Sequence, residues 1–592
     1  MLNDDHLQDN INEWLKNSSL QEQKEIEDLK KRDPQKFQNA FSKKLTFGTG
    51  GIRGKVGLGT AFINEKTIRA VTKGLAFYIN KQSLAAGIFK QVLIGYDSRI
   101  DSRFFAEETA KVLAAEGIKV YLFDLLRPVV AVSFGIKHLN CCAGVMITAS
   151  HNPASDNGYK VYWSDGGQVI APHDQEIMNA IAHLKDPFLV RGVDSLNHPL
   201  IKEIGEEVDQ AYEEKVSGIL FHPDDNFRYG KDLAIIYSNL HGAGISWVPH
   251  LLSTFGFDQL SFVEEQRALN GNFPGLKAPN PEEEQALRPG LEQMQKDKAD
   301  IFLITDPDCD RIGVAVINKG AAFSFTGNQM ACMLTEYICR HLHHRNLLSK
   351  DSKFVKTIVT TEILKRIVSF YGADLSEVVT GFKYIGEKIS SWESTTSKFI
   401  FGCEESYGYL FGTHARDKDA VVTAALICEM TLQLKLQGSS LTDFLMAIYS
   451  LHGLMKEKTI AIELLDEDKI DTIALLLKEL REDLDKGDTA KGISILQAED
   501  YKTGTQYNYA LGSVQKKNID GFPCSDVIRL FTKDGSKIVI RPSGTEPKIK
   551  LYVELYDSSI KGATTEEVFQ AFISGDDEID AMIQHIRALW RL

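Results

Sequence analysis

The stretch QVLIGYDSRIDSRFFAEETAKVLAAEGIKVYLF, residues 91–123, decides the fold class. Residues 91–96 are an apolar run with the β-branched side chains that favour a strand. Residues 104–117 have the apolar spacing of a helix and end in glycine, and residues 119–123 again have a strand pattern. A strand, a helix and a second strand in this order predict an α/β unit built on a largely parallel sheet.

The same alternation recurs along the chain and divides it into four parts. A charged helical stretch at residues 203–216 follows the first block, a turn at residues 318–320 closes the second, and a charged helix at residues 462–488 precedes the last strands. We therefore predict four domains, at residues 1–205, 206–320, 321–455 and 456–592. Further strands are expected at residues 233–237, 301–304, 312–316, 356–359, 398–401, 527–531 and 537–540.

The composition is that of a globular protein and excludes several functional classes. Of the 592 residues, 43% are hydrophobic and 25% are charged, which excludes a collagenous or wholly disordered chain. The net charge of −14 argues against a nucleic-acid-binding surface. With neither a secretory signal nor a run of eighteen apolar residues, the sequence predicts a cytoplasmic protein that does not span a membrane. The eight cysteines include no C-x-x-C pair and are expected to be buried free thiols.

A first candidate loop is TASHNP, residues 148–153, which follows an apolar run at residues 144–147. Its serine, Ser150, lies between small residues and before a turn that Pro153 stops, so we expect the hydroxyl to be presented rather than packed. Such a hydroxyl is a candidate nucleophile or phosphate carrier. The alternative is an ordinary hydrogen-bonded turn, since Ser, Asn and Pro are common turn residues.

A second loop, DPDCDR at residues 306–311, has a carboxylate at every second position between two predicted strands. Asp306, Asp308 and Asp310 would repel one another, because each negative charge raises the cost of ionising the next. A hard divalent cation removes this conflict, and Mg²⁺ takes oxygen ligands and commonly binds together with a phosphate. An EF-hand is excluded, because the sixth position is Arg and the twelfth is Ile. A solvated acidic turn is the remaining alternative.

These two loops explain each other if Ser150 carries a phosphate. The phosphate brings about two negative charges and three acceptor oxygens, one of which would complete the coordination of the cation. The cation would in turn make the phosphorus more electrophilic.

Two further loops have side chains suited to a sugar phosphate. Residues 402–408, GCEESYG, contain adjacent acids and a serine between glycines, and this combination is suited to accepting hydrogen bonds from sugar hydroxyls. RDKD at residues 416–419 adds cations nearby. Residues 541–548, RPSGTEPK, combine Arg, Lys, two hydroxyls and a Gly, the composition of a phosphate cradle. A solvated face and a polar strand connection are the respective alternatives.

In this order along the chain, the motifs resemble those of the α-D-phosphohexomutases. The resemblance extends from about residue 40 to about residue 560 and includes FGTGGIRG at residues 47–54 and TGFK at residues 380–383. Within the family, these sequences together with EESYGY and ARDKDA are similar to the long bacterial phosphoglucomutases, which are related to the eukaryotic phosphoglucomutase-2 type. The resemblance implies three similar α/β domains plus a smaller, mobile C-terminal α+β domain around a central cleft.

The resemblance also implies a reaction and its residues. Glucose 1-phosphate and glucose 6-phosphate would be interconverted through phosphorylated Ser150 and glucose 1,6-bisphosphate, with Mg²⁺ held by Ser150, Asp306, Asp308 and Asp310. The implied catalytic residues are Ser150, His151, Arg53, Lys160 and Lys418. The implied substrate-binding residues are Arg311, Thr380, Gly381, Glu404, Ser406, Lys418, Arg541, Ser543, Gly544, Thr545 and Lys548.

Individual roles follow from the same resemblance. Arg53 would offset charge that develops on the transferred phosphoryl group. Lys160 would be a general acid/base with a pKa lowered by Arg53 and the metal, or else a plain phosphate counter-ion. Phosphomannomutase-type members have a G-E-M-S-G-H loop whose final His assists acid/base work; here that position is Gly408, so that mannose specificity is disfavoured and Lys418 is expected to take a related role.

Two alternatives stay open within this chemistry. One is a synthase that makes and releases glucose 1,6-bisphosphate from an external phosphoryl donor, and the other is a phosphopentomutase. The sequence leaves open the oligomeric state and the role of the first forty residues.

Overall fold

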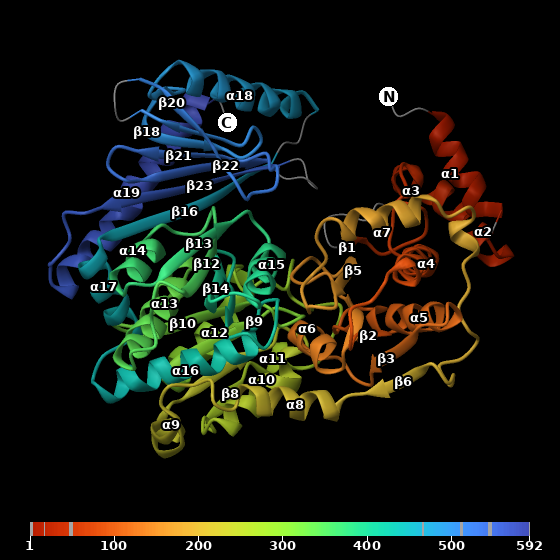
Figure 1. Ribbon diagram of the computed structural model, residues 1–592, viewed down its shortest axis with the longest axis horizontal. Helices are drawn as coiled ribbons and strands as arrows, with labels where there is room; N and C mark the ends of the chain where they lie inside the picture. The colour runs from red at the N-terminus through yellow and green to blue at the C-terminus, as the bar shows by residue number, and fades with distance from the viewer. Residues whose placement is uncertain are drawn as a thin grey trace. The chain divides into compact units, whose positions relative to one another are not determined.

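The computed structural model describes residues 4–16, 18–45, 51–463, 467–509, 513–542 and 548–590 (Figure 1). The chain forms two compact units, the first of Met1–Gly327 with Phe382–Gln433 and the second of Asn328–Gly381 with Leu434–Leu592. Each unit has its own hydrophobic core. The α/β class expected from the sequence is confirmed.

The first sheet of the first unit has six strands in the order β1-β5-β4-β2-β3-β6. Its strands are β1 (Gly51–Lys55), β2 (Phe89–Tyr96), β3 (Lys119–Phe123), β4 (Cys141–Ile147), β5 (Asp156–Trp163) and β6 (Ile201–Ile204). The pairs β2–β3, β2–β4 and β3–β6 are parallel, and β5 pairs antiparallel with β4 and β1. Every residue of β4 is buried, because helices cover both faces of such a sheet. Helices α4 (Glu65–Lys81), α5 (Ser102–Ala115), α6 (Val129–His138) and α7 (His173–Ala182) belong to this part of the chain.

The second sheet of this unit has the order β11-β10-β9-β7-β8. Its strands are β7 (Ile235–Ser238), β8 (Leu260–Phe262), β9 (Ile301–Thr305), β10 (Ile312–Asn318) and β11 (Ala321–Phe325). The pair β7–β9 is parallel, whereas β9 and β10 form an antiparallel hairpin whose turn is residues 306–311. The same unit includes α8 (Glu206–Val216), α10 (Gly244–Thr254), α12 (Glu284–Asp297), α15 (Phe382–Trp392) and the hairpin of β14 (Lys398–Glu404) and β15 (Gly408–Phe411).

Three helices precede β1 and the six-stranded sheet along the chain: α1 (Asp4–Lys16), α2 (Leu20–Arg32) and α3 (Pro34–Phe41). The boundary between α2 and α3 is fixed by Asp33, which ends one helix and whose carboxylate accepts the Lys36 amide at the start of the next. Pro34 at the first position of α3 is favoured there, because its missing N–H is not needed.

The second unit contains an antiparallel sheet in the order β16-β23-β22-β21-β18-β19-β20. Its strands are β16 (Leu454–Glu463), β18 (Ile493–Asp500), β19 (Thr505–Asn508), β20 (Gln515–Asn518), β21 (Ile528–Thr532), β22 (Lys537–Pro542) and β23 (Lys548–Asp557), with β17 (Thr489–Ala490) beside β18. Helix α19 (Thr565–Trp590), drawn in blue in Figure 1, contacts β16 and β23. An antiparallel sheet with flanking helices is the α+β arrangement expected for the C-terminal part.

The second unit also includes the parallel pair β12 (Ser352–Thr357) and β13 (Asp374–Val378). Its other helices are α13 (Gly327–His344), α14 (Ile363–Phe370), α17 (Leu441–His452) and α18 (Glu467–Lys486). Helix α16 (Ala420–Leu436) begins in the first unit. In the described part of the chain no single helix is long and apolar enough to cross a membrane, and only the bent pair α16 and α17 passes that test together.

Four expectations need correction. The strand expected at residues 356–359 ends at Thr357, where a turn is closed by the bond from the Thr360 amide to the Thr357 carbonyl (3.1 Å). The strand expected from residue 233 begins at Ile235, since residues 230–232 form a 3-10 turn. The helix expected from residue 203 begins at residue 206, because residues 201–204 pair with β3. Seven cysteines are buried free thiols, but Cys524 is exposed.

Candidate active site

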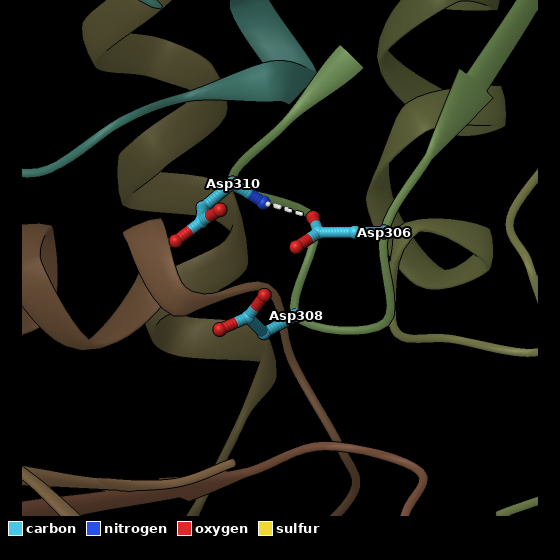
Figure 2. A group of neighbouring side chains, drawn as sticks. All are labelled: Asp306, Asp308 and Asp310. Atoms are coloured by element: carbon cyan, nitrogen blue, oxygen red, sulfur yellow. Dashed lines mark hydrogen bonds between the residues drawn. The ribbon is translucent and has the colours of Figure 1, made fainter. Parts of the chain in front are cut away.

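The turn between β9 and β10 gathers three carboxylates. Asp306, Asp308 and Asp310 are buried, and ligand oxygens from all three lie within 4.8 Å of one another (Figure 2). The amides of Asp310 and Arg311 both donate to Asp306 Oδ1 at 3.1 Å, which holds the turn closed. Cys309 completes the turn in the left-handed conformation, with φ of 55°.

The donor set fits a hard divalent cation. Burial and the neighbouring charges of Asp308 and Asp310 raise the pKa of Asp306 well above its ordinary value. Among the described residues, Asp308 Oδ1 and Asp310 Oδ1 are buried oxygens without a hydrogen-bond partner. Such orphaned oxygens are costly unless a cation or a donor satisfies them, and all-oxygen ligands suit Mg²⁺.

Ser150 faces this cluster from the turn after β4. Its Oγ donates to Asp306 Oδ2 at 2.7 Å and lies 3.2 Å from His151 Nδ1. The residue is buried and has the left-handed φ of 51°, a conformation that costs energy for a non-glycine residue. Its amide donates to Thr148 Oγ1 at 2.8 Å. The sequence motif therefore places the serine hydroxyl against the carboxylates, as expected from the two loops.

Arg99 holds the serine turn in shape and was missed by the sequence analysis. Its buried guanidinium donates to four backbone carbonyls of the turn: Ser150 (2.5 Å), Asn152 (2.6 Å), Pro153 (2.8 Å) and Asp156 (2.9 Å). Asp97 lies beside it, with its Oδ2 3.4 Å from Arg99 Nε, and accepts the Thr148 hydroxyl at 2.6 Å. A charged pair directly after the buried strand β2 was the available sequence signal, because loops at the carboxyl ends of parallel strands form ligand sites.

Two lysines approach the carboxylates from other elements. Lys160, on β5, places Nζ 2.8 Å from Asp308 Oδ2 and 3.4 Å from Asp310 Oδ2. Lys418 places Nζ 3.0 Å from both Asp310 Oδ2 and Asp417 Oδ1. Burial alone would raise the pKa of Asp310, but these ammonium groups outweigh it and bring the pKa below its ordinary value.

The pKa of Lys160 depends on the aspartates that surround it. Burial does lower it, but the attraction of Asp308 and Asp310 is larger, so that the pKa of Lys160 lies above its ordinary value. The pKa of Lys418 is likewise raised, because Asp310 and Asp417 outweigh the effect of burial. These aspartates therefore favour the ammonium form of both side chains.

Gly408 makes room for Lys418. A Cβ atom at position 408 would lie 2.1 Å from Cδ of Lys418, far inside the contact distance. Gly408 is also fixed by the backbone, since it forms a β-bridge with Arg311 and pairs with Glu404 in the β14–β15 hairpin. The residue that distinguishes this loop from the G-E-M-S-G-H type is thus the one that admits the lysine.

The remaining residues expected near this cluster come from β1, from the serine turn after β4 and from the β14–β15 hairpin. Arg53, on β1, donates from Nη1 to Asn152 Oδ1 at 3.0 Å. Burial, together with the positive charges of Arg311 and Arg53, lowers the pKa of His151 well below its ordinary value. Glu404, at the end of β14, is buried and interacts electrostatically with Arg311 and Lys418.

The structure thus brings most of the expected catalytic and metal-binding residues of the first unit together. Ser406 lies in the turn between β14 and β15. Thr380, Gly381, Arg541 and Lys548 belong to the second unit: the first two follow β13, and the last two lie at the end of β22 and the start of β23. Ser543, Gly544 and Thr545 lie outside the described residues.

Comparisons with known proteins show the family to which the chain belongs. Four family models match, described as phosphoglucomutase/phosphomannomutase α/β/α domains I, II and III at residues 44–187, 211–320 and 326–450, and the C-terminal domain at residues 467–571. The chain is 36% identical over 524 residues to a phosphoglucomutase of Staphylococcus aureus strain MSSA476, covering 87% of this chain and 90% of that protein. It is 33% identical over 546 residues to a phosphoglucomutase of Staphylococcus haemolyticus, covering 91% of this chain and 95% of that protein.

Solved structures show the same fold. Parafusin, a phosphoglucomutase from Paramecium in an open form, superposes with a TM-score of 0.66 at 17% identity, over 92% of this chain and 96% of that one. A phosphoglucomutase/phosphomannomutase family protein from Burkholderia thailandensis gives a TM-score of 0.63 at 17% identity, over 90% of this chain and 97% of that one.

Proposed function

We propose that this chain, which belongs to the phosphoglucomutase/phosphomannomutase family of α-D-phosphohexomutases, interconverts glucose 1-phosphate and glucose 6-phosphate. The observation that carries the proposal is the Ser150 hydroxyl, 2.7 Å from a carboxylate of a buried three-aspartate cluster. Relatives that are 33–36% identical over most of their length are phosphoglucomutases, which favours this activity over a bisphosphate synthase or a phosphopentomutase.

The proposed reaction has two phosphoryl transfers. Phosphorylated Ser150 gives its phosphoryl group to the free hydroxyl of the sugar phosphate: the P–Oγ and sugar O–H bonds break, a P–O bond to the sugar forms, the proton passes to Ser150 Oγ, and glucose 1,6-bisphosphate results. The bisphosphate reverses its orientation, and Ser150 takes the phosphoryl group from the other end while its proton passes to the sugar oxygen that is released. The phosphate of the sugar has then moved between the 1- and 6-positions, and the serine is phosphorylated again.

Protons are proposed to move at Ser150 Oγ. His151 Nδ1 lies 3.2 Å from this atom, and the lowered pKa of His151 keeps the imidazole neutral and able to accept the serine proton. The neighbouring aspartates favour the ammonium form of Lys160 and Lys418. Lys160 is proposed as a general acid/base or as a phosphate counter-ion. Together with Arg53, the two lysines would offset charge on the transferred phosphoryl group.

Asp306, Asp308 and Asp310, with an oxygen of phosphorylated Ser150, would hold Mg²⁺. When bound, the cation draws electron density from the phosphoryl group and neutralises negative charge. The chain's own contribution is the buried turn, in which two backbone amides fix Asp306 and in which Asp308 Oδ1 and Asp310 Oδ1 have no hydrogen-bond partner among the described residues.

Substrate recognition is proposed to come from one loop of each domain, with the domains at residues 1–205, 206–320, 321–455 and 456–592. Glu404 and Ser406 would accept hydrogen bonds from sugar hydroxyls, and Arg311, Thr380 and Gly381 are proposed as further substrate-binding residues. The non-reacting phosphate would lie on Arg541, Ser543, Gly544, Thr545 and Lys548. Glucose 1,6-bisphosphate is proposed as activator as well as intermediate, and the enzyme as cytoplasmic.

The test measures glucose 6-phosphate formed from glucose 1-phosphate with Mg²⁺, with and without catalytic glucose 1,6-bisphosphate. We expect turnover that the bisphosphate primes, and at least about 10⁴-fold less with Ser150→Ala, because that variant has no phosphoryl carrier. Ser155→Ala, on the same turn and exposed, is the matched control and should keep wild-type activity. A fully active Ser150→Ala protein would exclude the phosphoserine mechanism, and an inactive primed wild type would exclude this substrate.

A further inference from the structure

We infer that the N-terminal helices α1–α3 are a device that positions Arg53, with Lys66 as its positioning residue. The inference rests on the proposed function, in which Arg53 meets the transferred phosphoryl group. These helices precede the first matched family domain, which begins at residue 44. The catalytic cluster described above includes no residue of these helices, so that any effect they have on catalysis must be indirect.

The three helices form a small core of their own. Trp14 and Phe41 are fully buried in it, and their rings meet edge to face at 6.1 Å. The buried Asn10 amide donates to the Phe41 carbonyl at 2.8 Å, which ties α1 to the end of α3. Other core residues are Ile11, Ile26, Leu29, Phe37 and Ala40, with Phe188, Leu58 and Phe62 from the following domain packed among them.

The end of α3 is joined to the segment 57–62, directly after β1. The Ala40 carbonyl accepts the Ala61 amide at 3.0 Å. Thr60 is bound on both sides: its Oγ1 donates to the Lys43 carbonyl and its carbonyl accepts the Leu45 amide, both at 2.7 Å. The contact is tight, because a Cβ at Gly59, whose φ is +112°, would lie 2.3 Å from the Ala40 oxygen.

The residue that follows this segment, Ile63, is in turn bonded to β1, the strand that carries Arg53. The Lys55 carbonyl at the end of β1 accepts the Ile63 amide at 2.8 Å. On the other side, the Leu45 side chain lies beside Gly54, with Cδ1 3.6 Å from the place of a Cβ there. Among the described strands, β1 is terminal in its sheet and pairs with β5 alone. The contacts with residues 45 and 63 therefore restrain β1 in addition to its pairing with β5.

Lys66, at the start of α4, connects the helices to this domain. Its side chain is buried, and Nζ lies 2.9 Å from Glu22 Oε1 of α2 and 3.1 Å from Ser18 Oγ. The ammonium group also lies over the Trp14 ring, 4.5 Å from its centroid. One cation thus contacts the α1–α2 junction and the core of the helices, and removing it weakens the attachment without touching the active site.

A double-mutant cycle tests the inference. Lys66→Met keeps the apolar stem and removes the charge, and Lys24→Met on the exposed face of α2 is the matched control. If the helices act through Arg53, Lys66→Met lowers kcat about 3- to 10-fold with KM little changed, because the loss falls on the transition state. In an Arg53→Lys background the same substitution should cost less than about 2-fold, since the interaction it supports is already impaired. Lys24→Met should leave both backgrounds unchanged.

Amide hydrogen exchange gives a readout that does not need activity. Lys66→Met should speed exchange across residues 51–55 while leaving β3 of the same sheet unchanged. Equal losses of kcat in both backgrounds, or an unchanged kcat and unchanged exchange of β1, would overturn the inference. An inactive wild type would instead refute the proposed function, and the exchange data would still show whether the helices restrain β1.

Discussion

At the scale of single residues, the Lys418 side chain occupies the space that a Cβ atom at position 408 would need. Gly408→Ala places a methyl group 2.1 Å from Lys418 Cδ, so the lysine must leave Asp310 or the hairpin must shift. We expect kcat for glucose 1-phosphate to fall about 100-fold, roughly 2.7 kcal/mol of transition-state stabilisation. Gly218→Ala, where the new Cβ would have nothing within 4 Å, is the control. Wild-type kinetics for Gly408→Ala would show that Lys418 is not needed where it lies.

Arg99 gives a second prediction at this scale. Arg99→Met removes four charge-assisted hydrogen bonds to the carbonyls of the serine turn and leaves them buried. Ser150 should then relax from its left-handed conformation and accept a phosphoryl group poorly. Intact mass after incubation with glucose 1,6-bisphosphate should show less than about a tenth of the wild-type phosphorylation, a loss of more than about 1.4 kcal/mol. Arg103→Met, at an exposed neighbouring arginine, should phosphorylate normally; equal phosphorylation of Arg99→Met would contradict the role.

The sequence predicted the candidate catalytic and metal-binding residues, but not the residues that hold them in position. Ser150 and the three aspartates lie in short motifs whose chemistry is visible in their composition. Arg99 is distant from Ser150 in sequence, and only the pairing of β2 with β4 brings their loops together. The steric role of Gly408 depends on a side chain ten residues away, on a different loop, and no local pattern encodes such a contact.

At the scale of elements, Glu362 at the start of α14 lies beside cations from three strands: Lys356 of β12, Lys537 of β22 and Arg529 of β21. Burial alone would raise its pKa, but Lys356 of β12 and Lys537 of β22 outweigh burial and bring the pKa to about 2. Because the folded-state pKa lies below the unfolded one, Glu362 stabilises the second unit above about pH 4.5, and this is lost as the pH falls towards 2.

Glu362→Gln should therefore lower the free energy of unfolding at pH 7 by about 3 kcal/mol and by much less at pH 3. Chemical unfolding of both proteins at the two pH values measures the difference. Glu206→Gln, an exposed glutamate in α8, should show neither effect. A penalty that is equal at pH 7 and pH 3 would mean that the loss comes from packing and not from the carboxylate charge.

Elements were predicted well where the apolar pattern was long and uniform. The strand at residues 119–123 has the predicted bounds, and β9 and β10 were expected within two residues of each of their ends. The errors at β7 and β12 came from turns that compete with a strand for the same backbone groups. Helices α1–α3 lie in the first forty residues, whose role the sequence left open because their packing partners are residues 57–62 and Phe188.

At the scale of the whole molecule, the chain passes between its two units three times, after Gly327, Gly381 and Gln433. Neither unit is therefore a continuous segment that truncation could isolate. Each has its own buried core, and the features on which the predictions rest are divided between them: the three aspartates belong to the first unit and Glu362 to the second.

This division predicts two separable thermal transitions. Mg²⁺ at 100 times its dissociation constant stabilises the state that binds it by about 2.7 kcal/mol, and only the first unit holds the three aspartates. Scanning calorimetry should show that Mg²⁺ raises the midpoint of one transition by a few degrees and that Glu362→Gln at pH 7 lowers the midpoint of the other. Asp308→Asn should abolish the Mg²⁺ effect without moving the transition that Glu362→Gln affects. A single transition that moves with every one of these changes would mean that the two units unfold as one cooperative body, and the separate cores would then carry no independent stability.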